Sequence, residues 1–315
     1  MKLSLMVQVY NGGAYWRECL DSIKENLDLF DAVYVSIGKS PKQETDVKLL
    51  RDFPADKVHW IRQSREMSAK EHGMKLDRWV GSFHPEGHIF ILCHDDILLR
   101  EGLLKLRELD LNDNDAVFGP FFFFSQDQSS RPMLVHEFHR DDGQPLDKDE
   151  FIFLQDQQRF TYNVSGLVLP AKLFIEYPLP WHLLRYGCYS ECTHLIYPGI
   201  RHIYQTVIPT VKIRRHGASE GALMKSDDLL HDSLVYHLIS TAVAGTPQLR
   251  KFQTRSVLFL LRQDPRKGFC WFIQFQIRLA RLKFYYPAGW RIYAYMVPII
   301  FQKIFNGLEK LFRSG

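Results

Sequence analysis

The chain has 315 residues, of which 46% are hydrophobic and 24% charged, and its formal net charge is +4. This hydrophobic content excludes a disordered chain and is enough for one large α/β domain with an appendage, or for two modest domains. Five cysteines are too few for a disulfide-rich secreted scaffold, and Met1 leads directly into a short apolar run, so we expect a reducing, cytoplasmic location.

Short strand-like runs alternate with helical patterns through the first part of the chain. Tyr15, Cys19, Ile23 and Leu27 recur every four residues and predict one face of a helix. The alternation predicts an α/β fold with a mainly parallel central sheet and flanking helices, in which ligands bind at the carboxyl ends of the strands. The predicted strands are residues 3–9, 32–37, 58–61, 88–93 and 116–124.

The stretch "IFILCHDDILLREGLLKL" contains an apolar run that ends abruptly in His94, Asp95 and Asp96, before an amphipathic helical pattern begins. Adjacent carboxylates repel each other, and burying them is costly unless a cation or hydrogen-bond donors meet them. Asp95 and Asp96 therefore mark either a ligand site at a strand end or simply the cap of the following turn and helix.

The rest of the first 224 residues gives weaker signals. The polar, Asp-rich region of residues 132–161 predicts surface loops or a small excursion from the sheet. Residues 163–174 predict a strand, a turn and a short helix, and residues 182–199 a helix with a break near Gly187. Residues 206–213 predict a last strand, which runs into a loop that begins "RRHGASEG".

Five sequence features follow one another along the chain. They are a strand ending in "VYNGG" with "YWRECLDSI" after it, a strand ending in an acidic pair, "SGLVLP", a helix with an acidic residue, and "RRHGAS". This succession resembles the inverting family 2 glycosyltransferases of bacterial surface-polysaccharide and lipopolysaccharide biosynthesis. The resemblance covers roughly residues 1–221. It implies a glycosyltransferase A-type fold, a nucleotide-sugar-binding catalytic domain at 1–224, and transfer of a sugar with inversion from a nucleotide-diphosphate donor to a saccharide or lipid-linked saccharide.

The resemblance assigns the acidic pair to metal binding. Aligned on "LCHDDIL", the family's Asp-x-Asp motif has its first Asp at Cys93 and its second at Asp95. Asp95 is then expected to bind the donor and to hold Mn²⁺ or Mg²⁺, which neutralises charge on the leaving diphosphate. Asp96 is a further expected donor-site residue, which compensates for the missing first carboxylate.

Three residues after the last predicted strand are expected on the diphosphate side of the site. His216 resembles the family histidine that meets the metal or the diphosphate, and Arg214 and Arg215 are expected to pair with phosphate oxygens. The alternative is that all three are solvated loop residues.

Glu191 is the expected general base that takes the proton from the acceptor hydroxyl. It is the only carboxylate in "YGCYSECTHL", where the family carries an acidic pair at the head of a helix. Two registers are open: with Glu191 at the first acidic position, Cys192 stands at the second, and with Glu191 at the second, Ser190 stands at the first. The alternative is an exposed helix residue without a catalytic role.

We expect the floor of the nucleotide site to be formed by Val9, Tyr10 and Asn11, which lie at the carboxyl end of the first predicted strand. The family aspartate that accepts from the nucleobase is missing, because Ile37 and Gly38 stand in its place. The sequence therefore does not identify the base.

The C-terminal region, residues 225–315, predicts a helical extension rich in aromatic and basic residues. From residue 250 onward there are thirteen Lys and Arg against two acidic residues, a net charge of +11, which leaves −7 on the rest of the chain. Its uncharged runs are shorter than the roughly 18 to 20 residues that a membrane-spanning helix needs. We expect it to bind an anionic membrane peripherally, on the inner face of the plasma membrane. The alternative is packing on the catalytic domain or in an oligomer.

Two other classes of protein remain open, and no feature predicts a nucleic-acid partner. A sugar nucleotidyltransferase also needs an α/β domain with acidic metal ligands, but it should carry a glycine-rich, basic phosphate loop, and "YNGGAYWREC" has only Arg17. A non-catalytic membrane-associated binding protein would explain the basic C-terminal region and the missing carboxylate at Cys93.

Overall fold

The structure is a computed structural model. It describes residues 1–125, 133–135, 144–157, 163–176, 194–196, 199–215 and 226–263.

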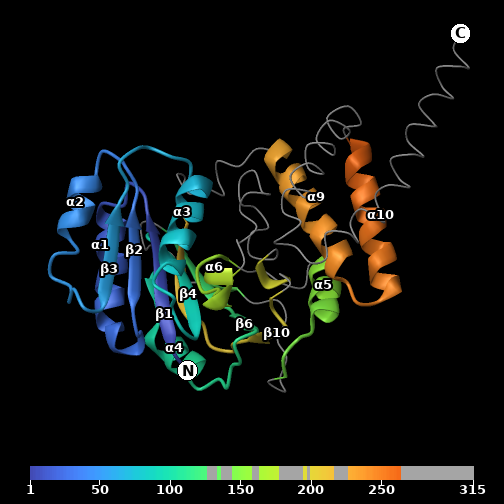
Figure 1. Cartoon of the computed structure of the whole chain (residues 1–315), viewed down its shortest axis with the longest axis horizontal. Helices are drawn as coiled ribbons and strands as arrows, with labels where there is room; N and C mark the ends of the chain where they lie inside the picture. Colours follow the sequence, from blue (N-terminus) through green and yellow to red (C-terminus); the bar gives the residue numbers. More distant parts are fainter. Residues whose placement is uncertain are drawn as a thin grey trace, which may run out of the picture.

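A seven-stranded sheet forms the centre of the molecule, in the order β10-β6-β9-β4-β1-β2-β3 (Figure 1). All of its strands run in the same direction except β9, which is antiparallel to both neighbours. The sheet confirms the predicted α/β class. Its strands are β1 (Leu3–Val9), β2 (Val33–Ile37), β3 (Val58–Arg62), β4 (His88–Cys93), β6 (Asp115–Phe118), β9 (Val168–Pro170) and β10 (His202–Gln205).

A second, four-stranded sheet has the order β5-β11-β7-β8. In it, β11 pairs parallel with β7 and antiparallel with β5, the short strand that follows the acidic pair. The carboxyl end of β11 is therefore brought beside the turn after β4. The four strands are β5 (Ile97–Leu98), β7 (Phe121–Ser125), β8 (Met133–Val135) and β11 (Val211–Arg215).

Helices cover both faces of the central sheet. One hydrophobic cluster joins alternate residues of β1 and β4 to α1 (Ala14–Glu25) and α4 (Arg100–Arg107). The other cluster joins the opposite faces of these strands to the second group of helices. Burial on both faces explains why the strands are nearly continuous apolar runs. The second group is α3 (Ala69–Gly81), α5 (Lys148–Asp156), α6 (Lys172–Glu176) and α9 (Ser226–Val243).

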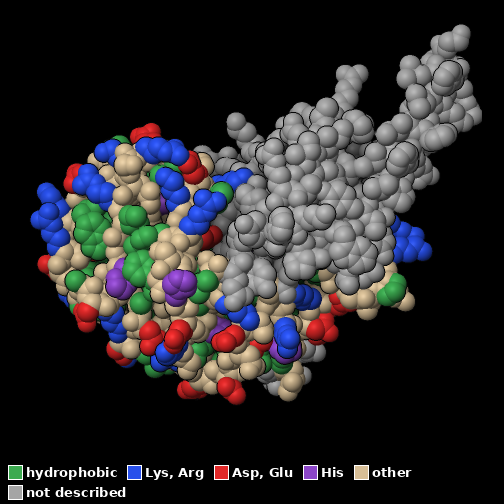
Figure 2. All heavy atoms as spheres, viewed as in Figure 1, with side chains coloured by type: hydrophobic (Ala, Val, Ile, Leu, Met, Phe, Trp, Pro, Cys, Tyr) green, Lys and Arg blue, Asp and Glu red, His purple; other side chains and the backbone are tan. Residues whose placement is uncertain are grey.

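Three shorter or peripheral elements complete the described helices: η1 (Leu27–Leu29), α2 (Gln43–Lys48) and α10 (Pro247–Gln263). Figure 2 shows hydrophobic and histidine side chains gathered over β2, β3 and α3. In this region His59 stacks on Tyr34, with ring centroids 5.5 Å apart, and the ring of Phe83 contacts both His59 and Trp79. This aromatic cluster packs α3 against the β3 edge of the sheet.

The strands predicted at 3–9 and 88–93 have the predicted bounds, but the single strand predicted over 116–124 is wrong. It is divided into β6 and β7, which belong to different sheets. Pro120 lacks the N–H that a continuous ladder needs. At Gly119, an added Cβ would lie 1.8 Å from Oγ1 of Thr206, so the chain passes too close for a side chain there.

The surface loops predicted over 132–161 are also wrong in part, because α5 packs into the core through Phe151 and Ile152. Asp147 caps this helix by accepting a hydrogen bond from the backbone N–H of Glu150 (2.8 Å). The acidic residues of the first helical turn gave the segment a polar composition that concealed the apolar stripe.

The last strand lies further along the chain than predicted. β11 begins at Val211, two residues after Pro209, and it includes Arg214 and Arg215, which were expected in a loop. The strand β10 was not predicted. Consecutive arginines usually indicate exposed loops, but here one of them is buried against partners from distant parts of the chain.

The helices α9 and α10 contact each other and lie next to α5 (Figure 1). The carboxylate of Asp149 on α5 accepts hydrogen bonds from the backbone N–H groups of Gly245 (2.6 Å) and Thr246 (2.7 Å), between the two helices. Buried residues of α9, such as Val235 and Ile239, belong to the same hydrophobic cluster as Ile89 of β4. Among the described residues, no helix combines the length and apolar character that a membrane span requires.

Replacement of Asp156 by asparagine should stabilise the protein above neutral pH. Burial raises the pKa of Asp156 from 3.8 to about 7, despite the hydrogen bond from Gln253 on α10. Between these values unfolding releases a proton, so the native state loses stability as the pH rises from about 4 to 7. Urea denaturation should show Asp156→Asn more stable than the wild type by about 1 to 2 kcal/mol at pH 8, and little different at pH 4. A pH-independent difference would contradict this account.

Candidate active site

The carboxyl ends of β1, β2 and β4 lie at one edge of the central sheet. The side chain of Val9 is buried, and its carbonyl accepts a hydrogen bond from the N–H of Gly38 (2.7 Å), which joins the ends of β1 and β2. Tyr10 is 47% exposed, and Asn11 is exposed with a φ of 53° in the left-handed region. The chain therefore presents Tyr10 and Asn11 at this edge, while Val9 contributes backbone only.

Asp46 of α2 fixes the loop that carries Tyr10 and Asn11. Its fully buried carboxylate accepts hydrogen bonds from the backbone N–H groups of Gly12 (3.1 Å) and Gly13 (2.9 Å). These two amides are consequently paired with a carboxylate of the protein. On the other side of the loop, a Cβ added to Gly12 would lie 3.2 Å from a ring carbon of His94, so the loop also meets the acidic turn.

Replacement of Asp46 by asparagine should lower the free energy of unfolding by about 2 kcal/mol, because the amide nitrogen of asparagine cannot accept from a second backbone N–H. Chemical denaturation measures this loss, with Asp21→Asn as the control because Asp21 is exposed on α1. An equal, small effect of both substitutions would mean that the Asp46 contacts do not hold the loop.

A buried group of uncharged polar side chains lies where the sequence lacks the expected base-binding aspartate. Ser36 of β2 is hydrogen-bonded to Nε2 of His72 (2.7 Å) and accepts from the side-chain amide of Gln63 (2.9 Å). Burial lowers the pKa of His72 to about 4, with further lowering by His94 and Lys75, so this imidazole is neutral at pH 7. Any polar contact to a ligand from this group would come from an uncharged side chain.

The two carboxylates of the acidic turn have different environments. Asp95 is partly exposed, whereas Asp96 is 3% exposed and accepts hydrogen bonds from the hydroxyl of Ser165 (2.5 Å) and the backbone N–H of Arg214 (2.9 Å). Burial, and secondarily the charge of Asp95, raises the pKa of Asp96 to about 8. Asp96 is thus bonded within the protein, and Asp95 is the more accessible of the two.

The donor atoms at this turn fit a divalent cation. One ligand atom each from Cys93, Asp95 and Asp96 lie within 4.8 Å of one another. Because Asp96 is buried and Asp95 is partly exposed, the carboxylate of Asp95 is the oxygen donor of the pair that is more accessible to an ion that also binds a ligand from solution.

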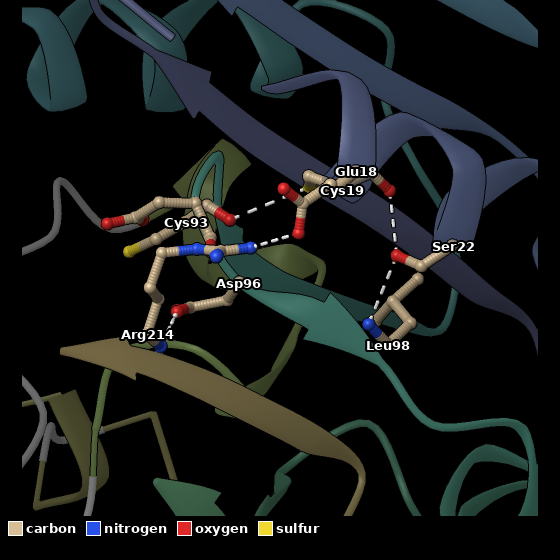
Figure 3. A network of polar contacts seen from close by, with 8 residues as sticks. Glu18, Cys19, Ser22, Cys93, Asp96, Leu98 and Arg214 are labelled. Atoms are coloured by element: carbon tan, nitrogen blue, oxygen red, sulfur yellow. Dashed lines mark hydrogen bonds and ion pairs between the residues drawn. The ribbon is translucent and has the colours of Figure 1, made fainter. Parts of the chain in front are cut away.

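Arg214 and Arg215 are adjacent in β11, but the side chain of Arg214 is buried and Arg215 is exposed. The Arg214 side chain is only 1% exposed and pairs with Glu18 of α1 (2.5 Å between Nη2 and Oε2), as Figure 3 shows. Arg215 is exposed, and its guanidinium carbon lies 3.7 Å from the centroid of the Phe123 ring. Asp95, Asp96 and Arg214 are therefore brought together. Glu191 and His216 lie outside the described residues.

Sequence reasoning missed Glu18, Asp46, His72 and Ser165. Each is one residue among many of its type, and its partner is distant in the chain, by 196 positions for Glu18 and Arg214 and by 69 for Asp96 and Ser165. Without knowledge of the strand pairing, no local pattern identifies them.

No protein-family model matches the chain, and no curated protein matches it by sequence. Solved structures match it in fold. A structure of TarS from S. aureus matches with a TM-score of 0.57 and 11% identity over 83% of this chain. A structure of TarS residues 1–349 in complex with UDP matches with a TM-score of 0.56 and 13% identity, again over 83% of this chain.

The chain spans 43% of the longer TarS chain and 71% of the chain of residues 1–349. The mostly parallel sheet, its flanking helices and these matches show that the chain has the glycosyltransferase A-type fold.

Proposed function

We propose that the chain is a glycosyltransferase that moves a sugar from a nucleotide-diphosphate donor to a saccharide or lipid-linked saccharide, with inversion and with the help of Mn²⁺ or Mg²⁺. The observation that carries the proposal is the accessible Asp95 at the carboxyl end of β4, beside the loop that presents Tyr10 and Asn11. Such strand ends are where open α/β sheets bind their ligands. The UDP in the TarS structure of the same fold supports a nucleotide donor.

Each of these residues has a proposed part in the reaction. Tyr10 and Asn11 contact the nucleoside, and Asp95 holds the metal ion, which stabilises the negative charge that develops on the leaving diphosphate. Arg215 adds positive charge near the phosphates. Glu191 takes the proton from the attacking hydroxyl, and His216 assists on the metal or diphosphate side.

The pairing of Asp46 with the amides of Gly12 and Gly13 disfavours the sugar nucleotidyltransferase alternative. That class needs backbone N–H groups of the first loop to cradle phosphates, and here a carboxylate occupies two of them.

Thermal shift with a panel of UDP-, GDP-, CDP- and dTDP-sugars tests the proposal and identifies the base. We expect one nucleotide class to raise the melting temperature in the presence of Mn²⁺, and raise it less in the Asp95→Asn variant. Equal shifts in the two proteins, or no shift with any nucleotide sugar, would contradict the proposed donor site.

We further propose that α10 and the residues after it associate with an anionic membrane surface, which places the enzyme peripherally at the inner face of the plasma membrane. On α10, Phe252 (51%) and Phe259 (62%) are exposed at i and i+7, with Arg255 between them and Lys251 adjacent. Exposed aromatic and basic residues on one helical face suit an interface with anionic lipid.

The double variant Phe252→Ser, Phe259→Ser should sediment with anionic vesicles several-fold less than the wild type, because it loses the inserting side chains. The full chain is used, since Gln253 of α10 is buried and removal of the helix would disturb the core. The exposed Phe153 on α5 provides the control variant Phe153→Ser. Equal sedimentation of all three proteins, or no preference for anionic over neutral vesicles, would overturn the membrane proposal.

A further inference from the structure

Arg214 carries a cation that is almost completely buried inside the candidate site. Its Nη2 donates to Oε2 of Glu18 (2.5 Å), and its Nε donates to the backbone carbonyl of Asp95 (3.0 Å). The rings of Tyr15 and Phe124 lie 4.6 and 4.5 Å from its guanidinium carbon. Burial of a charge is costly unless it is paired and hydrogen-bonded in this way. The guanidinium is thus directed toward groups of the protein.

The backbone of Arg214 holds the other acidic residue of the turn. Its N–H donates to Oδ1 of Asp96, and the opposite oxygen of Asp96 accepts from the hydroxyl of Ser165. The same Ser165 oxygen accepts from the N–H of Cys93 (2.8 Å). The turn after β4 is therefore held by Ser165 on one side and by Arg214 on the other, and Figure 3 shows Arg214 between this turn and Glu18.

We infer that Arg214 is a positioning residue, which orients the turn that carries Asp95, and that it does not contact the donor phosphates. The inference rests on the proposed function, in which Asp95 holds the metal ion. To reach a phosphate, the Arg214 side chain would have to leave both Glu18 and the two rings. The adjacent Arg215 is exposed, with its guanidinium over the ring of Phe123, and the proposed function keeps the contact with the diphosphate for this residue.

The geometry of the contacts requires arginine at this position. Nε and Nη2 donate at the same time to groups on two different elements, the turn after β4 and α1. The flat guanidinium also lies against the rings of Tyr15 and Phe124. A lysine ammonium is a compact point charge, which keeps the charge but cannot make both hydrogen bonds with the same geometry.

Measurements of Mn²⁺ binding and of nucleotide binding distinguish the roles of Arg214 and Arg215. The dissociation constant, measured from the electron paramagnetic resonance signal of unbound Mn²⁺, should rise about 10-fold in Arg214→Lys and in Glu18→Gln, because the turn loses its support. In Arg215→Gln it should change less than about 2-fold. Binding of UDP and GDP without metal should weaken in Arg215→Gln and stay unchanged in Arg214→Lys. The opposite pattern, in which Arg214→Lys weakens nucleotide binding and leaves the Mn²⁺ constant unchanged, would overturn the inference.

Amide hydrogen exchange of residues 95–98 tests the positioning role without any ligand. Exchange should be faster in Arg214→Lys and Glu18→Gln than in the wild type, and unchanged in Arg215→Gln. If the wild type binds no Mn²⁺, the proposed metal role of Asp95 fails, while faster exchange would still support the role of Arg214 in holding the turn. Unchanged exchange in both Arg214→Lys and Glu18→Gln would overturn that role whatever the metal result.

Discussion

Asp95→Asn is expected to reduce sugar transfer by about 10²- to 10³-fold or more, because it removes the negatively charged oxygen that holds the metal ion against the donor diphosphate. Asparagine keeps the size of the side chain, and the carbonyl of residue 95 still accepts from Nε of Arg214, so the turn should keep its shape. The measurement is the initial rate of transfer as a function of Mn²⁺ concentration.

Asp96→Asn is the matched comparison for this prediction. Asp96 accepts from Ser165 and from the N–H of Arg214, so its substitution should act on stability more than on the metal dependence of the rate. A loss of activity that is equal in the two variants would mean that the acidic pair acts as one structural unit. Full activity of Asp95→Asn, with an unchanged metal requirement, would exclude Asp95 as the metal ligand.

Glu191→Gln should lower the rate of transfer by at least about 10²-fold while donor affinity is retained, because glutamine preserves shape and removes the group that accepts the proton. The two quantities are measured separately, as the single-turnover rate and as the donor dissociation constant. The pH dependence of the rate should also lose the limb that reports ionisation of the base.

Glu101→Gln on α4 is the control for this second prediction, since Glu101 is an exposed carboxylate on a helix that packs on the sheet. This substitution should leave the single-turnover rate and the donor dissociation constant within about 2-fold of the wild-type values. If Glu191→Gln instead weakens donor binding as much as it slows transfer, Glu191 belongs to the donor site or to the structure, and the base must be another residue.

The central strands could be predicted because burial on both faces gives them an unmistakable pattern. β1 and β4 are buried along most of their length and are mainly apolar, so their limits were visible in the sequence. Elements at the periphery of the sheet were harder to predict. The acidic first turn of α5 concealed its buried face, and Gly119 and Pro120 divide what reads as one aromatic run into strands of two sheets.

The site could be predicted only where its residues follow a strand directly. Asp95 and Asp96 stand at the end of β4, and the pattern places them at the ligand-binding edge. The different environments of Asp95 and Asp96 depend on Ser165, in the segment before β9, and on Arg214, in β11. Such long-range contacts follow from the pairing of β11 with β5, which no local pattern encodes.

The most direct test of the proposed activity is release of nucleoside diphosphate from the nucleotide sugar that gives the largest thermal shift, with the purified 315-residue chain and Mn²⁺. We expect slow, metal-dependent release by hydrolysis in the absence of acceptor, and we expect this release to be lost on chelation of the metal and in Asp95→Asn. Release that continues unchanged in Asp95→Asn, or no release from any nucleotide sugar that binds, would contradict a metal-assisted glycosyltransferase.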